Sequence, residues 1–339
     1  MLPRPEDEIP LPMALAPMRR FALDGALLCF DRRTGLTAVC EGPETAHLRM
    51  RAPRVVQFSI TNACNLSCTF CSRDVTARSA WTAEEAFVLL RDLDRAGVLE
   101  VAFGGGEPLV FKGFAALVRR LDLETRLSVS LTTNGTRLDD TTIAALAPHV
   151  GQIRLSIYDD IDHRPILARL ARSGVRFGVN WLVTPARLPG LAAFVLELVE
   201  SGCRDILLLS YNGPDHALHL DHAEASELAR VARLLGRGLT GRVTLKLDVC
   251  WGERMAAVPR LFGGRPCSAG REFLVITSER QVSPCSFHHL RFPAETAEGV
   301  LRVWETHAFA LTAPAREPGC ARTPGFGLDG SPRRLPMTG

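Results

Sequence analysis

Several features that would place this protein in a known class are missing from its sequence. No apolar run approaches the ~20 residues of a membrane-spanning helix. The first twenty residues mix acidic residues and prolines with a short apolar patch, which is not the pattern of a signal peptide. The formal net charge is only +3, from 40 basic and 37 acidic residues, and offers no electrostatic case for binding nucleic acid or membrane. Lysine is almost absent (Lys112 and Lys246 only), from which we infer no function. A cytoplasmic protein is expected.

What is present indicates a globular protein with a large core. The chain has 339 residues, 46% of them apolar, which suffices for one large core or a core with a small added domain. Ten cysteines in a reducing compartment are metal ligands, catalytic groups or core residues more often than disulfides.

Strands and helices alternate regularly from about residue 55. Strands are expected at residues 55–60, 99–106, 126–135, 152–158, 176–184 and 205–211, and helices at 81–97, 113–123, 139–150, 164–174, 188–202 and 222–238. Six such units predict an α/β fold, a partial (β/α)6 TIM-like barrel over residues 51–250, with its chemistry at the C-terminal ends of the strands.

Two other segments flank this expected barrel. Residues 1–50 contain two short apolar pieces, 26–30 and 36–40, that predict a β-hairpin. Residues 251–339 carry two short strands, 273–277 and 281–285, and a helix at 296–311, which predict a small C-terminal α+β domain with an irregular tail.

Three cysteines follow the first expected barrel strand in the stretch CNLSCTFC, residues 64–71. Zinc sites mostly use four protein ligands, whereas three thiolates from Cys64, Cys68 and Cys71 suit a [4Fe–4S] cluster with one iron left open. Buried core thiols or part of a zinc site are the alternatives. The second strand ends in GGGEP, whose glycines permit close backbone approach to a ligand, although a plain strand-to-helix turn has the same composition.

Together these stretches resemble the radical S-adenosylmethionine (SAM) superfamily. The resemblance rests on CNLSCTFC, on GGEP at residues 105–108, and on the strand ends TTNG and IRLSIY, and it covers roughly residues 55–250. It implies that the open iron binds the amino and carboxylate groups of SAM. The reduced cluster then cleaves SAM to a 5′-deoxyadenosyl radical that abstracts hydrogen from a substrate.

The resemblance also implies contacts to SAM. Gly105, Gly106 and Glu107 are expected at the methionine amino group, and the strand-end residues Thr133, Asn134, Ser156 and Asn180 at its ribose and carboxylate. Each polar residue taken singly is equally compatible with a satisfied turn or core position. Asp159 is a further contact to SAM or substrate, or a solvated loop carboxylate.

The segment CSAGREFLVITSERQVSPCSF resembles the start of the auxiliary-cluster domain called SPASM, or its shorter form, twitch. That resemblance implies a second [4Fe–4S] cluster on four thiolates, namely Cys250, Cys267, Cys285 and Cys320. The sequence departs from the full pattern because a later run of cysteines is absent and Arg280 replaces the usual hairpin glycine, so one auxiliary cluster is expected. Zinc, buried thiols, or three ligands with an open site for substrate are the alternatives. Cys29 and Cys40 are expected in the core, and Cys203 in the core or at a helix end. His288 and His289 are expected in a surface loop, with an approach to the auxiliary site as the alternative.

The substrate is the least determined feature. A single auxiliary cluster and the few residues before the first barrel strand favour a small molecule, such as a sugar or nucleoside in a biosynthetic pathway. A maturase that modifies a ribosomally made peptide is the alternative, and a non-catalytic metal-binding protein of the same fold a more remote one. A flavodoxin or ferredoxin is the expected reductant.

Overall fold

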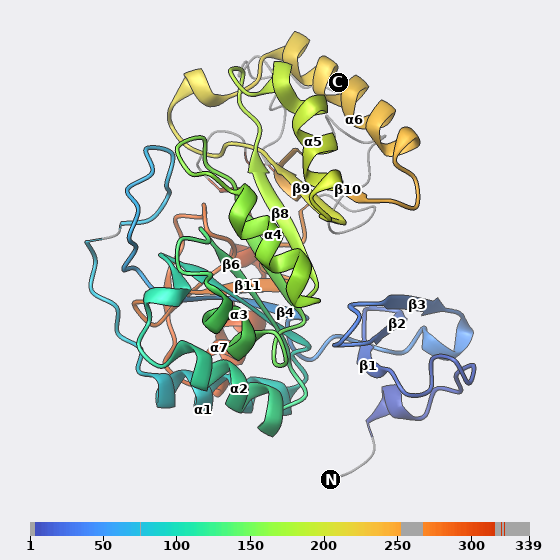
Figure 1. The fold of residues 1–339 in the computed structure, drawn as a ribbon. Helices are drawn as coiled ribbons and strands as arrows, with labels where there is room; N and C mark the ends of the chain where they lie inside the picture. Colours follow the sequence, from blue (N-terminus) through green and yellow to red (C-terminus); the bar gives the residue numbers. More distant parts are fainter. Residues whose placement is uncertain (1–3, 75, 252–266, 316–319, 321, 323–339) are drawn as a thin grey trace, which may run out of the picture.

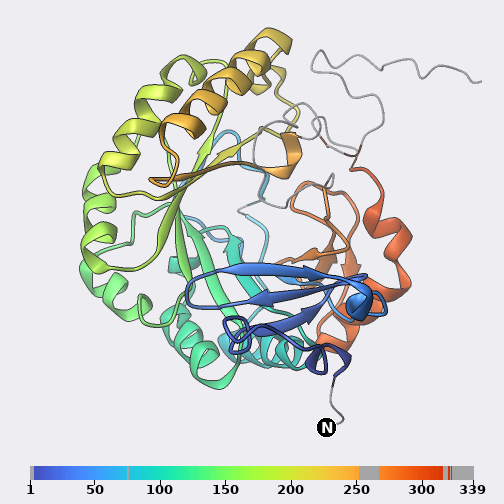
Figure 2. The ribbon, with the colours of Figure 1, turned by 90° about the vertical axis from the view of Figure 1, so that its right-hand side faces the viewer.

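A computed structural model describes residues 4–74, 76–251, 267–315, 320 and 322. Seven parallel strands form its main sheet: β4 (Val55–Thr61), β5 (Glu100–Gly105), β6 (Ser128–Thr133), β7 (Gln152–Ser156), β8 (Phe177–Leu182), β9 (Asp205–Leu209) and β10 (Thr244–Leu247). The helices between them are α1 (Ala83–Ala96), α2 (Phe114–Glu124), α3 (Asp140–Leu146), α4 (Arg164–Ser173), α5 (Leu191–Glu200) and α6 (His222–Gly238). The helices cover the outside of the curved sheet (Figures 1 and 2). This arrangement is the predicted partial barrel.

Local sequence signals set the helix ends. Thr82 caps α1: its hydroxyl accepts a hydrogen bond from the Glu85 backbone, and the Glu85 carboxylate accepts one from the Thr82 N–H at 2.9 Å. Gly97 ends the helix at φ 123°, a conformation that favours glycine. Both features depend on residues at or within a few positions of the helix ends.

The sheet continues past β4 into the C-terminal part of the chain. Strand β11 (Phe273–Ile276) pairs in parallel with β4, with Phe273 opposite Val55, and is followed by the antiparallel strands β12 (Gln281–Ser283) and β13 (Phe292–Pro293). Among the described strands, β10 and β13 are the two ends of the sheet, so no closed barrel forms. The predicted helix at 296–311 is two helices, α7 (Ala297–Thr306) and α8 (Ala308–Thr312). The division into domains at residues 50 and 250 stays a prediction.

The two faces of the sheet differ in polarity. Phe58 of β4 lies 5.3 Å from Trp81 and 5.7 Å from Phe103 (ring centroids), in the apolar layer under the helices. The inward-facing residues are more polar. Arg154 donates to the Asn180 side chain at 2.7 Å and pairs with Asp205 at 3.3 Å, and Asp205 also pairs with Lys246 at 2.8 Å. The interior of the barrel is thus lined in this region by charged and polar residues that pair with one another.

A separate antiparallel sheet precedes the barrel and comprises β1 (Arg19–Ala22), β2 (Ala26–Phe30) and β3 (Thr37–Glu41). The predicted hairpin is β2 and β3; β1 was not expected, because its sequence RRFA is short and half basic. This sheet lies at the N-terminal ends of the barrel strands (Figures 1 and 2).

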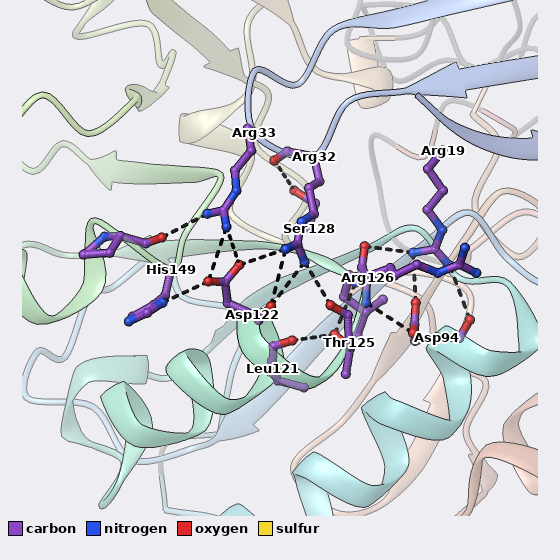
Figure 3. A network of polar contacts seen from close by, with 12 residues as sticks. Arg19, Arg32, Arg33, Asp94, Leu121, Asp122, Thr125, Arg126, Ser128 and His149 are labelled. Atoms are coloured by element: carbon purple, nitrogen blue, oxygen red, sulfur yellow. Dashed lines mark hydrogen bonds and ion pairs between the residues drawn. The ribbon is translucent and has the colours of Figure 1, made fainter. Parts of the chain in front are cut away.

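Arginines attach this sheet to the barrel (Figure 3). Asp122 of α2 pairs with Arg32 at 3.4 Å and Arg33 at 3.1 Å, and Asp94 of α1 pairs with Arg19 at 2.9 Å. Because it packs at the N-terminal ends, the sheet leaves the opposite end of the barrel free. In the described part of the chain, no helix combines the length and apolar character needed to cross a membrane.

Candidate active site

The three cysteines of CNLSCTFC lie in the loop that leaves the C-terminal end of β4. Cys64 and Cys68 are half-buried and Cys71 is exposed. The loop turns back on itself, since the Cys71 N–H donates to the Cys68 carbonyl at 3.1 Å. Burial and the nearby thiols of Cys71 and Cys64 raise the pKa of Cys68. Because neighbouring thiolates repel one another, a cation bound among the three would favour their ionised forms.

Gly105 and Gly106 pack against the base of this loop. The Gly106 N–H donates to the Thr61 carbonyl at 2.7 Å, and the Glu107 N–H to the Ala63 carbonyl at 2.9 Å. A Cβ added at Gly106 would lie 2.1 Å from the Ala63 oxygen, and one at Gly105 would lie 2.4 Å from the Thr61 oxygen. These glycines are therefore required by close approach of the β5 end to the chain entering the cysteine loop. The open space lies at Gly104, where an added Cβ meets no atom within 4 Å.

Glu107 is a buried carboxylate that joins the ends of β5 and β6. It is 1% exposed and accepts hydrogen bonds from the Thr133 hydroxyl and the Asn134 backbone N–H, both at 2.8 Å. It also accepts from the Leu109 N–H at 3.0 Å. Burial raises the pKa of Glu107, although these hydrogen bonds oppose the shift. With its oxygens so occupied, Glu107 holds the strand ends together.

Asn134 connects β6 to the cysteine loop. Its side-chain nitrogen donates to the Asn65 side chain at 2.9 Å and lies 3.9 Å from the Cys64 sulfur. Its oxygen accepts from the Thr136 hydroxyl at 2.7 Å. Of the two residues that the resemblance implied as SAM contacts, Asn134 thus contacts the cysteine loop, whereas Thr133 contacts Glu107.

Ser156 and Asn180 are paired residues on β7 and β8, on the inner face of the barrel. The Asn180 oxygen accepts from Arg154, which directs the amide nitrogen away from that arginine. Tyr158 follows β7, and its ring stacks on Phe70 with centroids 6.0 Å apart. Burial first, and the nearby Cys68, raise the pKa of Tyr158, whose hydroxyl lies close to both Cys68 and Ser156. Asp159 is largely exposed and pairs with Arg187 at 2.8 Å.

A second group of thiols forms from four distant parts of the chain. Burial raises the pKa of Cys250 well above its usual range, and Asp248, Cys267, Cys285 and Cys320 add to the effect. Burial likewise raises the pKa of Cys285 to about 11, with contributions from Cys267 and Cys320. Cys267 and Cys285 both pack against the apolar cluster around Val55 and Phe273. Cys250, which follows β10 on the far edge of the sheet, is within electrostatic reach of them and of Cys320. That the four form one site, as the resemblance implies, stays a prediction.

Both groups have the donor chemistry of iron–sulfur sites, in which thiolates hold the irons. Among the described residues, no three Cys, His, Asp or Glu side chains meet at the spacing needed to hold a single metal ion. The fit of an iron–sulfur cluster to these residues rests on the type of donor and on the convergence of the thiols.

The other cysteines are placed as follows. Cys29 and Cys203 are fully buried, as expected, and Cys40 is half-buried. The expectation of a surface loop is wrong for His288, which is 3% exposed and lies 3.3 Å from the Ala313 carbonyl oxygen.

A comparison with protein-family models identifies one part of the chain. Residues 58–176 match the Radical SAM superfamily. This stretch includes the cysteine loop, the GGGEP turn and strands β5 to β7. This part of the chain, about a third of its length, is therefore a radical SAM domain.

Curated relatives with similar sequences carry the name GTP 3′,8-cyclase. A probable GTP 3′,8-cyclase of Methanocaldococcus jannaschii is 27% identical over 171 residues, which cover 46% of this chain and 57% of that protein. The Rhodobacter capsulatus enzyme is 30% identical over 176 residues, 50% of this chain and 52% of the relative. This chain thus spans about half the length of these two relatives.

Two solved structures of proteins with bound S-adenosylmethionine share the fold. Streptococcus suis SuiB bound to S-adenosylmethionine superposes with a TM-score of 0.62 at 19% identity, covering 75% of this chain and 66% of SuiB. The enzyme anSMEcpe with bound AdoMet gives 0.62 at 17% identity, covering 76% and 81% of the two chains. At such identities the likeness establishes the fold alone.

The structure adds three features that the sequence did not single out as functional. Gly104, rather than Gly105 or Gly106, has open space at its Cα. Tyr158 and Phe70 form an aromatic contact beside Cys68. Arg73, two residues after Cys71, reaches back to Ser59 of β4 at 2.6 Å. The last contact had a visible signal, because a serine in an otherwise apolar strand needs a hydrogen-bonding partner.

Proposed function

We propose that this enzyme binds a [4Fe–4S] cluster at Cys64, Cys68 and Cys71 and uses SAM to abstract hydrogen from a small molecule. The observation that carries the proposal is the convergence of these three thiols beside the Asn134 side chain, at the C-terminal ends of the barrel strands. The site would also require a reductant, for which a flavodoxin or ferredoxin is expected. Ten cysteines without a disulfide among them support a cytoplasmic location.

The residues around the loop have defined tasks in this proposal. When bound, the cluster with SAM supplies a 5′-deoxyadenosyl radical, which is the reactive group. Glu107 and Asn134 hold the loop against β5 and β6, and the open Cα of Gly104 leaves room for close approach of SAM. Ser156 and Asn180 present polar groups on the inner face of β7 and β8, where we place the ribose or carboxylate of SAM. The stacked rings of Phe70 and Tyr158 shield Cys68 from water.

We further propose a single auxiliary [4Fe–4S] cluster on Cys250, Cys267, Cys285 and Cys320. Burial first, and then the neighbouring thiols, raise the pKa of Cys250 and Cys285, and thiols in such a place are expensive to ionise without a metal, which supports this proposal. Arg322 stabilises the arrangement by donating to the Cys267 carbonyl at 2.7 Å from the same segment that carries Cys320.

A small molecule as substrate is supported by the sequence relatives, whose names refer to the nucleotide GTP. Only part of each relative is matched, so the reaction proposed here extends no further than hydrogen abstraction. A peptide substrate is the alternative, and the experiment with extract fractions distinguishes it from a small molecule. SuiB has also been solved bound to its precursor peptide SuiA, and its likeness to this chain is one of fold.

Anaerobic reconstitution with iron, sulfide, dithionite and SAM tests the catalytic proposal. We expect 5′-deoxyadenosine from the wild type, none from Cys68→Ala, and wild-type amounts from Cys40→Ala, which alters a half-buried thiol of the N-terminal sheet. Two clusters require about eight irons per chain, and Cys267→Ala with Cys285→Ala should reduce this to about four. Absence of 5′-deoxyadenosine under all conditions would reject the proposal, and about four irons in the wild type would reject the auxiliary cluster.

The substrate class is tested with fractions of a cell extract from the source organism. We expect the small-molecule fraction to increase 5′-deoxyadenosine formation above the uncoupled rate, because a bound substrate holds a hydrogen atom within reach of the radical. An increase with the peptide fraction alone would replace the small-molecule assignment by the peptide one.

A further inference from the structure

The two ends of the cysteine loop are tied together by hydrogen bonds. The Asn62 N–H donates to the Ser79 hydroxyl at 2.8 Å, and the hydroxyl oxygens of Thr61 and Ser79 lie 3.0 Å apart. The Asn62 side-chain nitrogen donates to the Ala77 carbonyl oxygen at 3.4 Å. We call these four residues the neck of the cysteine loop, because the three cysteines lie between them in the sequence.

The tip of the β11–β12 hairpin lies on this neck. Glu279 accepts a hydrogen bond from the Asn62 side-chain nitrogen, across 217 positions of the sequence. Ala80, which directly follows the neck, is held through both of its backbone groups. Its N–H donates to the Ser278 carbonyl at 2.8 Å, and its carbonyl accepts from the Arg280 guanidinium at 2.8 Å. Three consecutive residues of the tip thus contact the chain at the neck or next to it.

Asn62 is the residue at which neck and hairpin meet. It is 2% exposed, and its side-chain nitrogen contacts both the Ala77 carbonyl and the Glu279 carboxylate. A side-chain amide nitrogen carries two hydrogens, so one is available for each of these acceptors. Asn62 precedes Cys64 by two residues. A shift of Asn62 would therefore move the backbone that leads into the first cysteine.

Glu279 has the charge and the position to act on Asn62. Burial acts to raise the pKa of Glu279, but hydrogen bonds from Asn62 and Thr277 outweigh it and lower the pKa. The carboxylate is therefore ionised near neutral pH, and an ionised oxygen is a stronger acceptor than a neutral one. The residue lies at an exposed turn position, so its substitution removes little buried surface.

From this arrangement we infer that Glu279 is a positioning residue for the site of SAM binding. It acts through Asn62, and the hairpin tip thereby holds the neck so that the cysteine loop has the geometry that SAM requires. Hydrogen-bonded neighbours orient metal ligands in the same way at other metal sites. The inference rests on the proposed function and deepens it, because it makes SAM binding depend on the hairpin that Cys267 and Cys285 flank.

Glu279→Ala in the full chain tests this inference with two measurements. After anaerobic reconstitution, equilibrium dialysis with labelled SAM should show binding weakened by about five- to tenfold. In the metal-free chain, hydrogen exchange of residues 62–74 should be faster by about fivefold, while exchange in the barrel strands stays unchanged. Glu279→Gln keeps an oxygen acceptor and should bind SAM within about twofold of the wild type. Glu298→Ala, which removes an exposed carboxylate that pairs within α7, is the matched control and should match the wild type.

Exchanging donor and acceptor between the two positions gives a second test. Asn62→Asp places a second carboxylate against Glu279 and should weaken SAM binding by at least about tenfold. Adding Glu279→Gln restores a hydrogen bond in the reverse direction and should return the affinity to within about threefold of the wild type. The remaining loss reflects the hydrogen bond from Asn62 to Ala77.

The outcomes separate the positioning role from a general loss of stability and from the proposed function. Wild-type SAM affinity in Glu279→Ala would overturn the inference, as would equal losses in Asn62→Asp with and without Glu279→Gln. Faster exchange throughout the barrel would also overturn it, since Glu279 would then support the whole fold. Exchange of the metal-free chain requires neither cluster nor radical, so it decides whether Glu279 orders the loop even if the wild type forms no 5′-deoxyadenosine.

Discussion

Single residues in this protein act mainly by supporting the cysteine loop. Gly106 lies against the Ala63 backbone, Glu107 joins β5 to β6, and Asn134 reaches Cys64. Residues that the sequence nominated as ligand contacts therefore have a structural task that is visible without any ligand. Their contacts to SAM stay predictions.

Gly106→Ala should displace the base of the cysteine loop. The new methyl group would lie 2.1 Å from the Ala63 carbonyl oxygen, which belongs to the backbone and cannot rotate away. We expect a loss of about 1–3 kcal/mol in the free energy of unfolding and a lower iron content after reconstitution. Urea denaturation and iron analysis measure the two effects.

Gly104→Ala is the matched control for this substitution. It adds the same methyl group two residues away, where no atom lies within 4 Å. Its stability and iron content should equal those of the wild type. Equal iron retention by both variants would show that close packing at Gly106 does not support the loop.

At the scale of elements, the β11–β12 hairpin is fastened to the start of α1. Arg280 occupies the hairpin turn at φ +61°, a conformation that usually favours glycine. Its guanidinium donates to Glu85 at 2.6 Å and to the Ala80 carbonyl at 2.8 Å, and it lies 5.0 Å from the Trp81 ring centroid. These contacts offset the backbone cost and explain an arginine where the family resemblance led us to expect glycine.

This fastening should make stability depend on pH through Glu85. Hydrogen bonds from Thr82, followed by Arg280, lower the pKa of Glu85 from 4.5 to about 2. A lowered carboxyl pKa stabilises the fold above the unfolded value, and that stabilisation is lost as pH falls from about 4.5 toward 2. Because the Glu85 side chain is 42% exposed, we expect Glu85→Gln to cost only about 0.5–1 kcal/mol at pH 7. The difference in the free energy of unfolding between Glu85→Gln and the wild type should shrink as the pH is lowered.

Urea unfolding at about pH 7 and pH 3 measures this effect. Glu200→Gln, at an exposed position at the end of α5, is the control and should show no difference at either pH. A double-mutant cycle with Arg280→Gln should show coupling between residues 85 and 280. A pH-independent cost for Glu85→Gln would contradict the assigned pKa shift.

At the scale of the whole molecule, ionic contacts join the N-terminal sheet to the base of the barrel. Asp122 pairs with Arg32, Arg33 and His149, and its side chain is only 8% exposed (Figure 3). Substituting asparagine would leave a buried polar group with weaker partners.

Asp122→Asn should loosen that sheet. We expect about 1–3 kcal/mol of destabilisation and faster proteolysis within residues 1–50, read by mass spectrometry. Asp92→Asn removes a carboxylate that is 36% exposed and pairs only within α1, so it should change stability by less than about 0.5 kcal/mol. If residues 1–50 of Asp122→Asn resist proteolysis as well as those of the wild type, apolar packing alone holds the sheet.

The cysteines of the proposed auxiliary site come from both sides of the open barrel. Cys250 follows β10 at one end of the sheet, whereas Cys267 and Cys285 flank the hairpin that extends the sheet beyond β4. A metal cluster at this position would connect segments that the described backbone hydrogen bonds leave apart.

Cys250→Ser should therefore lower iron and loosen both edges. We expect faster hydrogen exchange in β10 and β11, and chelation of iron from the wild type should have the same effect. Cys40→Ser, in β3, changes a half-buried thiol outside both groups and should alter neither measurement. Unchanged exchange in Cys250→Ser despite lost iron would show that the barrel edges are held by packing.

The sequence alone determined the order of the barrel elements, the capping of α1 and the thiol spacing of the first site. These depend on periodicity and on residues a few positions apart, which one chain displays directly. Only the tertiary structure decided that β11 pairs with β4, that Glu107 joins Thr133 and Asn134, and that Arg73 meets Ser286. These contacts link residues 26 to 218 positions apart, and the strand order that creates them is set by packing of the whole sheet rather than by any local pattern.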